Sequence, residues 1–180
     1  RHVVLDASPA VISNFQKRYP DAKIDIIECY FENFETEERF DIIVLGYILE
    51  HVDDPKLILE KFKKFLKPSG RIFITVPNAE VLNRKLGHLA GMLDNMQELS
   101  DHDLLLGHKR YYTVDSLKDD VESSGYHIEN IEGIYLKPLT TRQMLSLKLH
   151  KNIIDALCQV GVKYPELSCG IFLEARLKIK

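Results

Sequence analysis

The sequence has few cysteines and lacks any long apolar run. Its 180 residues include three cysteines at wide spacing, which matches neither a disulfide framework nor paired metal ligands. We therefore expect the chain to work in the reducing cytoplasm. No stretch approaches the roughly 20 consecutive apolar residues that a membrane-spanning helix needs, and no signal peptide opens the chain. These absences predict a protein that has no membrane partner.

The sequence also lacks a large excess of either basic or acidic residues. The formal net charge is -3, from 24 basic and 27 acidic residues mixed along the chain. This balance excludes the basic surface that is typical of a nucleic-acid binder, so we expect no nucleic-acid partner. The content of hydrophobic residues, 45%, and of charged residues, 28%, suits one globular domain with a full core. We predict a single domain over residues 1–180.

A glycine-rich phosphate loop is the third absence. The string G-x-G-x-x-G, which is typical of dinucleotide-binding proteins, occurs nowhere in the chain. The Tyr-x-x-x-Lys pair of short-chain dehydrogenases occurs only at Tyr19–Lys23, where Pro20 prevents the helical spacing. A nicotinamide oxidoreductase is therefore disfavoured, and a ligand with a single nucleoside fits better.

The pattern that is present alternates apolar strands with capped helices, as parallel-sheet proteins do. Ser8 with Pro9, Asp53 or Asp54 with Pro55, and Thr113 are the signals for helix starts. The string "KPSG" is expected to end the second helix, and a fourth helix is expected over 141–160. The continuously apolar strand at 40–46 is expected to be buried on both faces near the centre of the sheet. The predicted fold is α/β, a doubly wound and mostly parallel sheet, with strands at 3–6, 23–29, 40–46, 71–78, 127–136 and 169–180.

Polar groups follow several of these strands at the end where ligands of open parallel sheets bind. Asp6, Tyr30, the segment 46–51 and Asn78 all stand at such carboxyl ends. Glu50 and His51 are expected at the mouth of the resulting crevice. The loosely patterned segment 79–110, which contains three glycines, is expected to be an insertion that acts as a lid.

Four strings occur in an order that resembles one family: "VVLDASP", "FDIIVLGYILEHVDDP", "KPSGRIFITVPN" and "GHKRYYTVDSLKDDVESSGY". The chain is similar to class I methyltransferases that use S-adenosylmethionine. It is most similar to their small-molecule branch, in which L-E-H-V-x-D-P follows the central strand. The resemblance runs from about Val3 to Tyr126 and rests on the order and spacing of the motifs. It implies a Rossmann-like methyltransferase fold with an antiparallel C-terminal strand.

The resemblance also implies a cofactor site. Asp6, with Ala7 beside it, would bind the two ribose hydroxyls of S-adenosylmethionine. Tyr30 and Phe31 would lie by the adenine, although many members have an acid pair, G-D, where this chain has Cys29 and Tyr30. The segment beneath the methionine part of the cofactor would comprise Gly46, Tyr47 and Ile48.

The glycine-rich loop of the family would follow a strand that precedes Arg1. We expect that the sequence is truncated at its amino end. The alternative is a noncatalytic binding or interaction module that keeps this fold without its cofactor. Binding of S-adenosylhomocysteine separates the two interpretations.

Candidate catalytic and acceptor-binding residues follow from the same motifs. His51 is a candidate general base, or else it orients its loop. The cluster "DHDLLLGHKRYY" adds His108 as a second catalytic candidate, and the resemblance implies that Arg110 and Tyr111 line the acceptor pocket. Because the spacing of His102, Asp103 and His108 matches no standard metal site, we expect no metal.

The predicted function is transfer of a methyl group from S-adenosylmethionine to an oxygen or nitrogen of a small-molecule acceptor. An amine that loses its proton beforehand would need no general base. The sequence does not name the acceptor, decide between oxygen and nitrogen, or indicate the oligomeric state.

Overall fold

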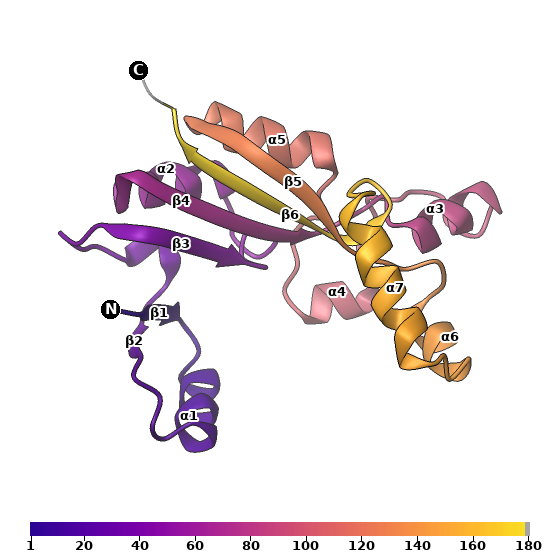
Figure 1. Ribbon diagram of the computed structural model, residues 1–180, viewed down its shortest axis with the longest axis horizontal. Helices are drawn as coiled ribbons and strands as arrows, with labels where there is room; N and C mark the ends of the chain where they lie inside the picture. Colours follow the sequence, from indigo (N-terminus) through magenta and orange to yellow (C-terminus); the bar gives the residue numbers. More distant parts are fainter. Residues whose placement is uncertain (179–180) are drawn as a thin grey trace. The chain divides into compact units, whose positions relative to one another are not determined.

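The computed structural model describes residues 1–178 (Figure 1). The chain divides into two compact units, residues 1–38 and a second unit that begins at Arg39. Residues 179–180, which belong to the predicted strand at 169–180, lie outside the described residues.

The first unit holds a pair of parallel strands and one helix. Strand β1 (Val3–Asp6) pairs with β2 (Asp25–Glu28), so that Asp6 lies opposite Glu28. Between them, Ser8 caps helix α1 (Pro9–Arg18) by accepting a hydrogen bond from the amide of Val11, which confirms the predicted helix start. A single 3-10 turn, η1 (Phe31–Asn33), follows β2.

The second unit is built on a four-stranded sheet in the order β3-β4-β6-β5. Strand β4 is parallel to β3, whereas β6 runs antiparallel to both of its neighbours, β4 and β5 (Figure 1). The predicted α/β class with an antiparallel C-terminal strand is therefore confirmed. In chain order the elements are β3 (Phe40–Gly46), α2 (Pro55–Lys63), β4 (Leu66–Pro77), α3 (Leu82–Leu89), α4 (Asp101–Leu105), α5 (Val114–Ser123), β5 (Tyr126–Leu136), α6 (Thr141–Ser146), α7 (Lys151–Val162) and β6 (Ser168–Leu177).

The core of this unit follows the two-residue period of its inner strands. Alternate residues of β4 and β6 face each other across the ladder and are completely buried. Helices α2 and α5 contribute further buried apolar side chains. Asp54 and Thr113 cap these two helices as predicted, because each side chain accepts a backbone hydrogen bond from the first turn. The buried strand residues are Ile72, Ile74 and Val76 on β4 and Ile171, Leu173 and Ala175 on β6.

Three predictions about single elements were wrong. The helix expected over 141–160 is two helices, because Lys148 adopts a φ of 46° and His150 caps a new start. The string "KPSG" belongs to β4, since α2 has already ended at Lys63. Within the described sheet β3 pairs with β4 alone, and Ile42 and Val44 are 57% and 64% exposed instead of buried.

Candidate functional site

A tight turn follows the carboxyl end of β3. Tyr47 has a φ of 56°, an uncommon conformation for a residue other than glycine. Its amide donates to the carbonyl oxygen of Thr75 at 2.9 Å and contacts the Thr75 hydroxyl at 3.2 Å. These bonds hold the exposed Gly46 and the half-buried Ile48 on either side of the turn. The segment predicted to lie beneath the cofactor is thus a fixed, partly open stretch of backbone.

Glu50 lies inside this loop rather than at a crevice mouth. Its side chain is 0% exposed, and within residues 1–178 neither carboxyl oxygen has a hydrogen-bond partner. Burial raises the pKa of this carboxyl to about 7, because removal from water disfavours the ionised form. The expectation that the Glu50 side chain lies at the mouth of a crevice was wrong. A buried and unpaired carboxyl is instead a group whose proton can move near neutral pH.

Two histidines lie beside Glu50, one from each of two distant segments. The rings of His51 and His108 meet edge to face with centroids 4.8 Å apart. Nδ1 of His51 lies 3.3 Å from the carbonyl oxygen of Gly107. Burial lowers the pKa of His108, and the neighbouring His51 lowers it further. The structure therefore brings together both predicted catalytic residues.

Asp103 is the nearest anion to this pair. Its Oδ1 lies 3.4 Å from Nδ1 of His108, and both side chains are nearly buried. Its Oδ2 accepts hydrogen bonds from Ser100 and from the hydroxyl of Tyr111. Burial alone would raise the pKa of Asp103, but the bonds from Ser100 and Tyr111 outweigh it and the pKa is lowered. Asp103 is thus an ionised carboxylate beside a neutral imidazole.

Arg110 supports the loop from the other side. Its guanidinium donates to the carbonyl oxygens of Leu49 at 2.9 Å and Val52 at 2.7 Å, and to that of Asp53 at 3.0 Å. The amide of the preceding residue, Lys109, donates to the carbonyl oxygen of Glu50 at 2.8 Å. Both terminal nitrogens of Arg110 thus donate hydrogen bonds to the backbone around Glu50. Binding of the methyl acceptor by Arg110 stays a prediction.

Replacing Arg110 by lysine should lower the free energy of unfolding by about 1–2 kcal/mol. An ammonium group cannot donate to three carbonyls in the fixed geometry of a guanidinium, and carbonyls that lose their partners remain half-buried. Urea unfolding followed by circular dichroism measures the change. Arg142→Lys on the exposed side of α6 is the matched control and should have no effect. Equal stability of R110K and wild type would contradict this role.

Tyr111 is fixed between two charged side chains. Its hydroxyl donates to Asp103, and the guanidinium of Arg84 lies 4.7 Å from the ring centroid. Burial and the Asp103 carboxylate raise the pKa of Tyr111 to about 12. Arg84 also donates to the carbonyl oxygens of Met96 and Glu98, which ties α3 to the segment before α4. The role of Tyr111 as an acceptor wall remains a prediction.

The other cofactor-binding candidates lie in the first unit. Oδ1 of Asp6 accepts from the amide of Ser8 at 2.7 Å, so the residue forms the turn into α1. The amide of Cys29 donates to the carbonyl oxygen of Asp6, which places the ends of β1 and β2 side by side. Ala7 is half-buried at the same turn, Tyr30 is 66% exposed, and Phe31 begins η1.

The polar groups at the ends of β1 and β2 fit a nucleoside in part. Within the described chain, Oδ2 of Asp6 is left without a hydrogen bond from another side chain or amide, so it can accept from a ribose hydroxyl. At the position predicted to lie by the adenine, the hydroxyl of Tyr30 is uncharged and is a weaker acceptor for an amino group than a carboxylate.

Glu50, His51 and His108 each offer one atom of a type that binds metals, and these atoms lie within 4.8 Å of one another. This spacing would also suit a cation. Because burial keeps the carboxyl proton on Glu50 up to about pH 7, the arrangement favours proton chemistry over metal binding at acidic to neutral pH. The absence of a metal stays a prediction.

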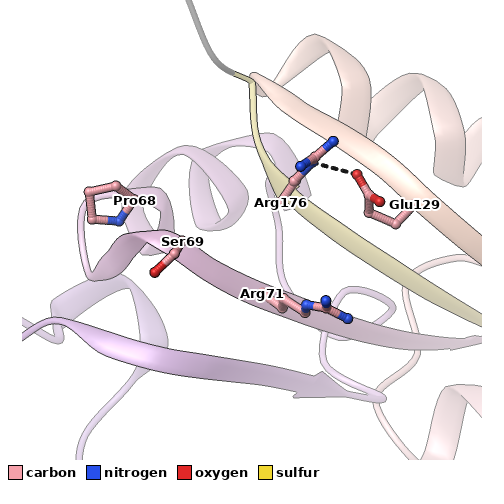
Figure 2. Close-up of a pocket in the computed structure, with 5 residues that line it drawn as sticks. All are labelled: Pro68, Ser69, Arg71, Glu129 and Arg176. Carbon is pink, nitrogen blue, oxygen red and sulfur yellow. Dashed lines mark ion pairs between the residues drawn. The ribbon is translucent and has the colours of Figure 1, made fainter.

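A pocket of about 430 Å³ lies at the other end of the sheet, where β4 begins (Figure 2). Two arginines line it, but Arg176 is paired with Glu129 at 2.5 Å and Arg71 with Glu174 at 2.5 Å. Since both charges are already neutralised by carboxylates, this pocket offers little to an anionic ligand. The β4 residues that line it belong to the first half of the strand, away from Pro77, and the pocket takes no part in the candidate site.

Comparison with known proteins now decides the family. The sequence profile described as "Methyltransferase domain" matches residues 3–131, which is more than half of the chain. The chain belongs to the S-adenosylmethionine-dependent methyltransferase family. The matched range contains β1 to β4, the loop with Glu50 and His51, and the segment with His108, Arg110 and Tyr111.

The curated relatives of this methyltransferase chain include ubiquinone biosynthesis O-methyltransferases. That of Aeromonas salmonicida is 29% identical over 122 residues, which cover 66% of this chain and 47% of the relative. The mitochondrial enzyme of Homo sapiens is 27% identical over 123 residues, which cover 67% of this chain and 32% of the relative. The chain thus spans between about a third and about half of the length of these relatives.

Solved structures confirm the methyltransferase fold. An S-adenosylmethionine-dependent methyltransferase from Mesorhizobium loti has a TM-score of 0.64 at 16% identity, covering 97% of this chain and 79% of the other. The N-methyltransferase NodS from Bradyrhizobium japonicum, in complex with S-adenosylhomocysteine, has a TM-score of 0.59 at 14% identity, covering 99% and 67%. Among residues 1–178, no helix is both long and apolar enough to cross a bilayer.

Sequence reasoning missed two features of the site. The burial of Glu50 was missed because the loop after β3 reads as polar, and its cover comes from residues more than 50 positions later. The contact between Asp103 and His108 was missed because Asp103 was considered only as a metal ligand. Their spacing of five residues, directly after the Ser100 cap, was the available signal.

Proposed function

We propose that this methyltransferase transfers a methyl group from S-adenosylmethionine to a hydroxyl oxygen of a small-molecule acceptor. The pair of His51 and His108 next to the turn after β3 carries this proposal. A hydroxyl must lose a proton as it attacks, whereas an amine that is already neutral needs no base. The O-methyltransferase names of the curated relatives support the choice of oxygen.

The proposed reaction needs positioning and one proton acceptor. When bound, S-adenosylmethionine supplies a methyl group on a positively charged sulfur. Transfer of that methyl group to the acceptor oxygen would leave the electron pair of the carbon–sulfur bond on sulfur, so the protein would need to supply only orientation and a proton acceptor. His108 takes the proton of the hydroxyl at Nε2, helped by a pKa below the ordinary imidazole value, which keeps the ring neutral and ready. His51 and the buried Glu50 surround this imidazole.

Cofactor recognition is proposed for the strand ends. Asp6 and Ala7 would hold the ribose, Tyr30 and Phe31 would lie against the adenine, and the backbone at Gly46–Ile48 would support the methionine part. The fixed turn at Tyr47 supports the last assignment, because its amide is held by Thr75 before any ligand arrives.

Asp6→Asn should weaken the binding of S-adenosylhomocysteine by about 1–3 kcal/mol, or roughly 5- to 160-fold. The amide retains an oxygen for the amide of Ser8, so the turn into α1 persists, but it cannot accept from both ribose hydroxyls. Isothermal titration calorimetry gives the dissociation constant. Asp21→Asn, on an exposed residue of the same unit, is the charge-matched control. Unchanged affinity in D6N would remove Asp6 from the cofactor site.

The function is tested in two steps on this chain and on the product of its complete gene. Calorimetry with S-adenosylhomocysteine, with NAD in parallel, should show saturable binding of the thioether alone. Formation of S-adenosylhomocysteine is then measured with protocatechuate, a catechol, and with histamine, an amine. Turnover of the catechol supports the proposal. Turnover of histamine alone would show that the methylated atom is a nitrogen and not an oxygen. No cofactor binding by either folded protein favours a noncatalytic module.

A further inference from the structure

Helix α4 contains one acidic side chain, that of Asp103, whose two oxygens have different surroundings. Oδ2 of Asp103 accepts from the amide of Ser100 at 2.9 Å, from the Ser100 hydroxyl and from the Tyr111 hydroxyl. These donors fix the plane of the carboxylate and leave Oδ1 free for another partner. In a capping box, the side chain of Asp103 would need to accept only from the amide of Ser100.

Oδ1 points to the imidazole of His108. The distance from Oδ1 to Nδ1 is 3.4 Å, and the two side chains are 14% and 13% exposed. Nδ1 is buried and makes no aligned hydrogen bond within the described part of the chain. The backbone fixes the spacing, because the amide of His108 donates to the carbonyl oxygen of Asp103 at 2.9 Å.

The identity of these atoms determines which ring nitrogen carries the proton. A lone pair on Nδ1 would face a carboxylate oxygen and be repelled, whereas an N–H at Nδ1 is attracted to it. With Nδ1 protonated, the lone pair of the neutral ring is on Nε2. An Nε2 lone pair is what a proton acceptor for the hydroxyl requires.

We propose that Asp103 is the positioning residue of this site. It holds the His108 ring in the Nδ1–H form, so that Nε2 can take the proton from the hydroxyl of the substrate. The catalytic use of Nε2 rests on the proposed function, whereas the Nδ1–H form of the ring does not depend on it. Asp103 also faces the imidazolium that forms after proton transfer, and a nearby anion stabilises that cation. The residue itself remains ionised and touches no reacting atom.

The ring form can be read without acceptor or cofactor. In ¹⁵N-labelled protein at about pH 8.5, well above the ordinary imidazole pKa of about 6.5, long-range ¹H–¹⁵N spectra distinguish the two ring forms. The signals of His108 are identified by their loss in His108→Gln. We expect Nδ1–H in wild type. In Asp103→Asn, the amide can donate to Nδ1, and the ring should change to Nε2–H.

Two matched variants separate positioning from folding. Asp101→Asn removes the same charge from the same helical turn at an exposed residue and should retain the wild-type spectrum. Ser100→Ala removes the hydroxyl cap of α4 but keeps the backbone amide and the Tyr111 hydroxyl that donate to Oδ2 of Asp103, so it should also retain Nδ1–H. A wild-type ring in the Nε2–H form, an unchanged ring in D103N, or the same change in S100A would each overturn the proposal.

The kinetic consequence is a second, independent readout. With protocatechuate as the probe, D103N should lower kcat by about 10-fold or more at an unchanged KM, because only the orientation of the base is affected. Affinity for S-adenosylhomocysteine should remain as in wild type. If the spectrum changes as expected but no acceptor turns over, the proposed function fails while the positioning role stands. A raised KM with unchanged kcat would contradict the positioning role.

Discussion

Glu50→Gln is expected to stabilise the protein by roughly 3 kcal/mol at about pH 8 and to change its stability little at about pH 4. The pKa of the Glu50 carboxyl is about 7 in the folded protein, above its ordinary value of 4.5, because the side chain is completely buried and unpaired. The folded state therefore holds a proton that the unfolded state has released between these two pH values. Stability falls as pH rises through this range, and the full penalty is present above pH 7.

The isosteric amide removes this penalty because it carries no charge at any pH. Urea unfolding at both pH values measures the difference between wild type and E50Q. Glu60→Gln, an exposed residue of α2, is the control for loss of a negative charge and should leave the pH dependence unaltered. An E50Q protein that loses stability between pH 5 and pH 8 as steeply as wild type would refute the assigned cause.

The same substitution should reduce methyl transfer while it stabilises the fold. A destabilising, ionisable group in the core is typical of sites where function opposes stability. A stabilised and fully active E50Q would indicate that Glu50 has no part in the reaction.

His108→Gln is expected to lower kcat with protocatechuate by about 100-fold, within the range of general-base contributions. Glutamine retains a polar side chain of similar size but cannot accept a proton, so affinity for S-adenosylhomocysteine should be unchanged. Because burial and His51 lower the pKa of His108, the rate of wild type should fall only below the ordinary imidazole pKa. In H108Q this fall of the rate at acidic pH, the acidic limb of the pH–rate profile, should be lost, and its loss is the decisive observation.

His51→Gln and His127→Gln complete this experiment. His127 lies half-exposed on β5, away from the site, and its replacement should have no effect. Replacement of His51 should have a smaller effect than replacement of His108, because the nearest carboxylate oxygen to an imidazole here is that of Asp103 at His108. If H51Q loses the acidic limb and H108Q keeps it, the base is His51.

Local sequence determined most of the elements. Ser8 and Thr113 were predicted as helix caps, and so was one of Asp53 and Asp54; Ser8, Asp54 and Thr113 act as such, because a cap bonds only to the first turn of its own helix. The break between α6 and α7 was missed, since the string around Lys148 and His150 contains neither glycine nor proline. A left-handed residue of ordinary type has no strong local signal.

The site was determined in two different ways. The sequence alone indicated the methyltransferase family and placed Asp6, His51 and His108 among its functional groups, because those motifs lie within short segments. Only the tertiary structure showed that Glu50 is buried, that Arg110 holds its loop, and that Asp103 faces His108. Burial, and the pKa changes that follow from it, depend on partners up to about 60 residues away along the chain, as in the bonds of Arg110 to Leu49 and Val52. Such proximity is a property of the packed chain and has no pattern in the local sequence.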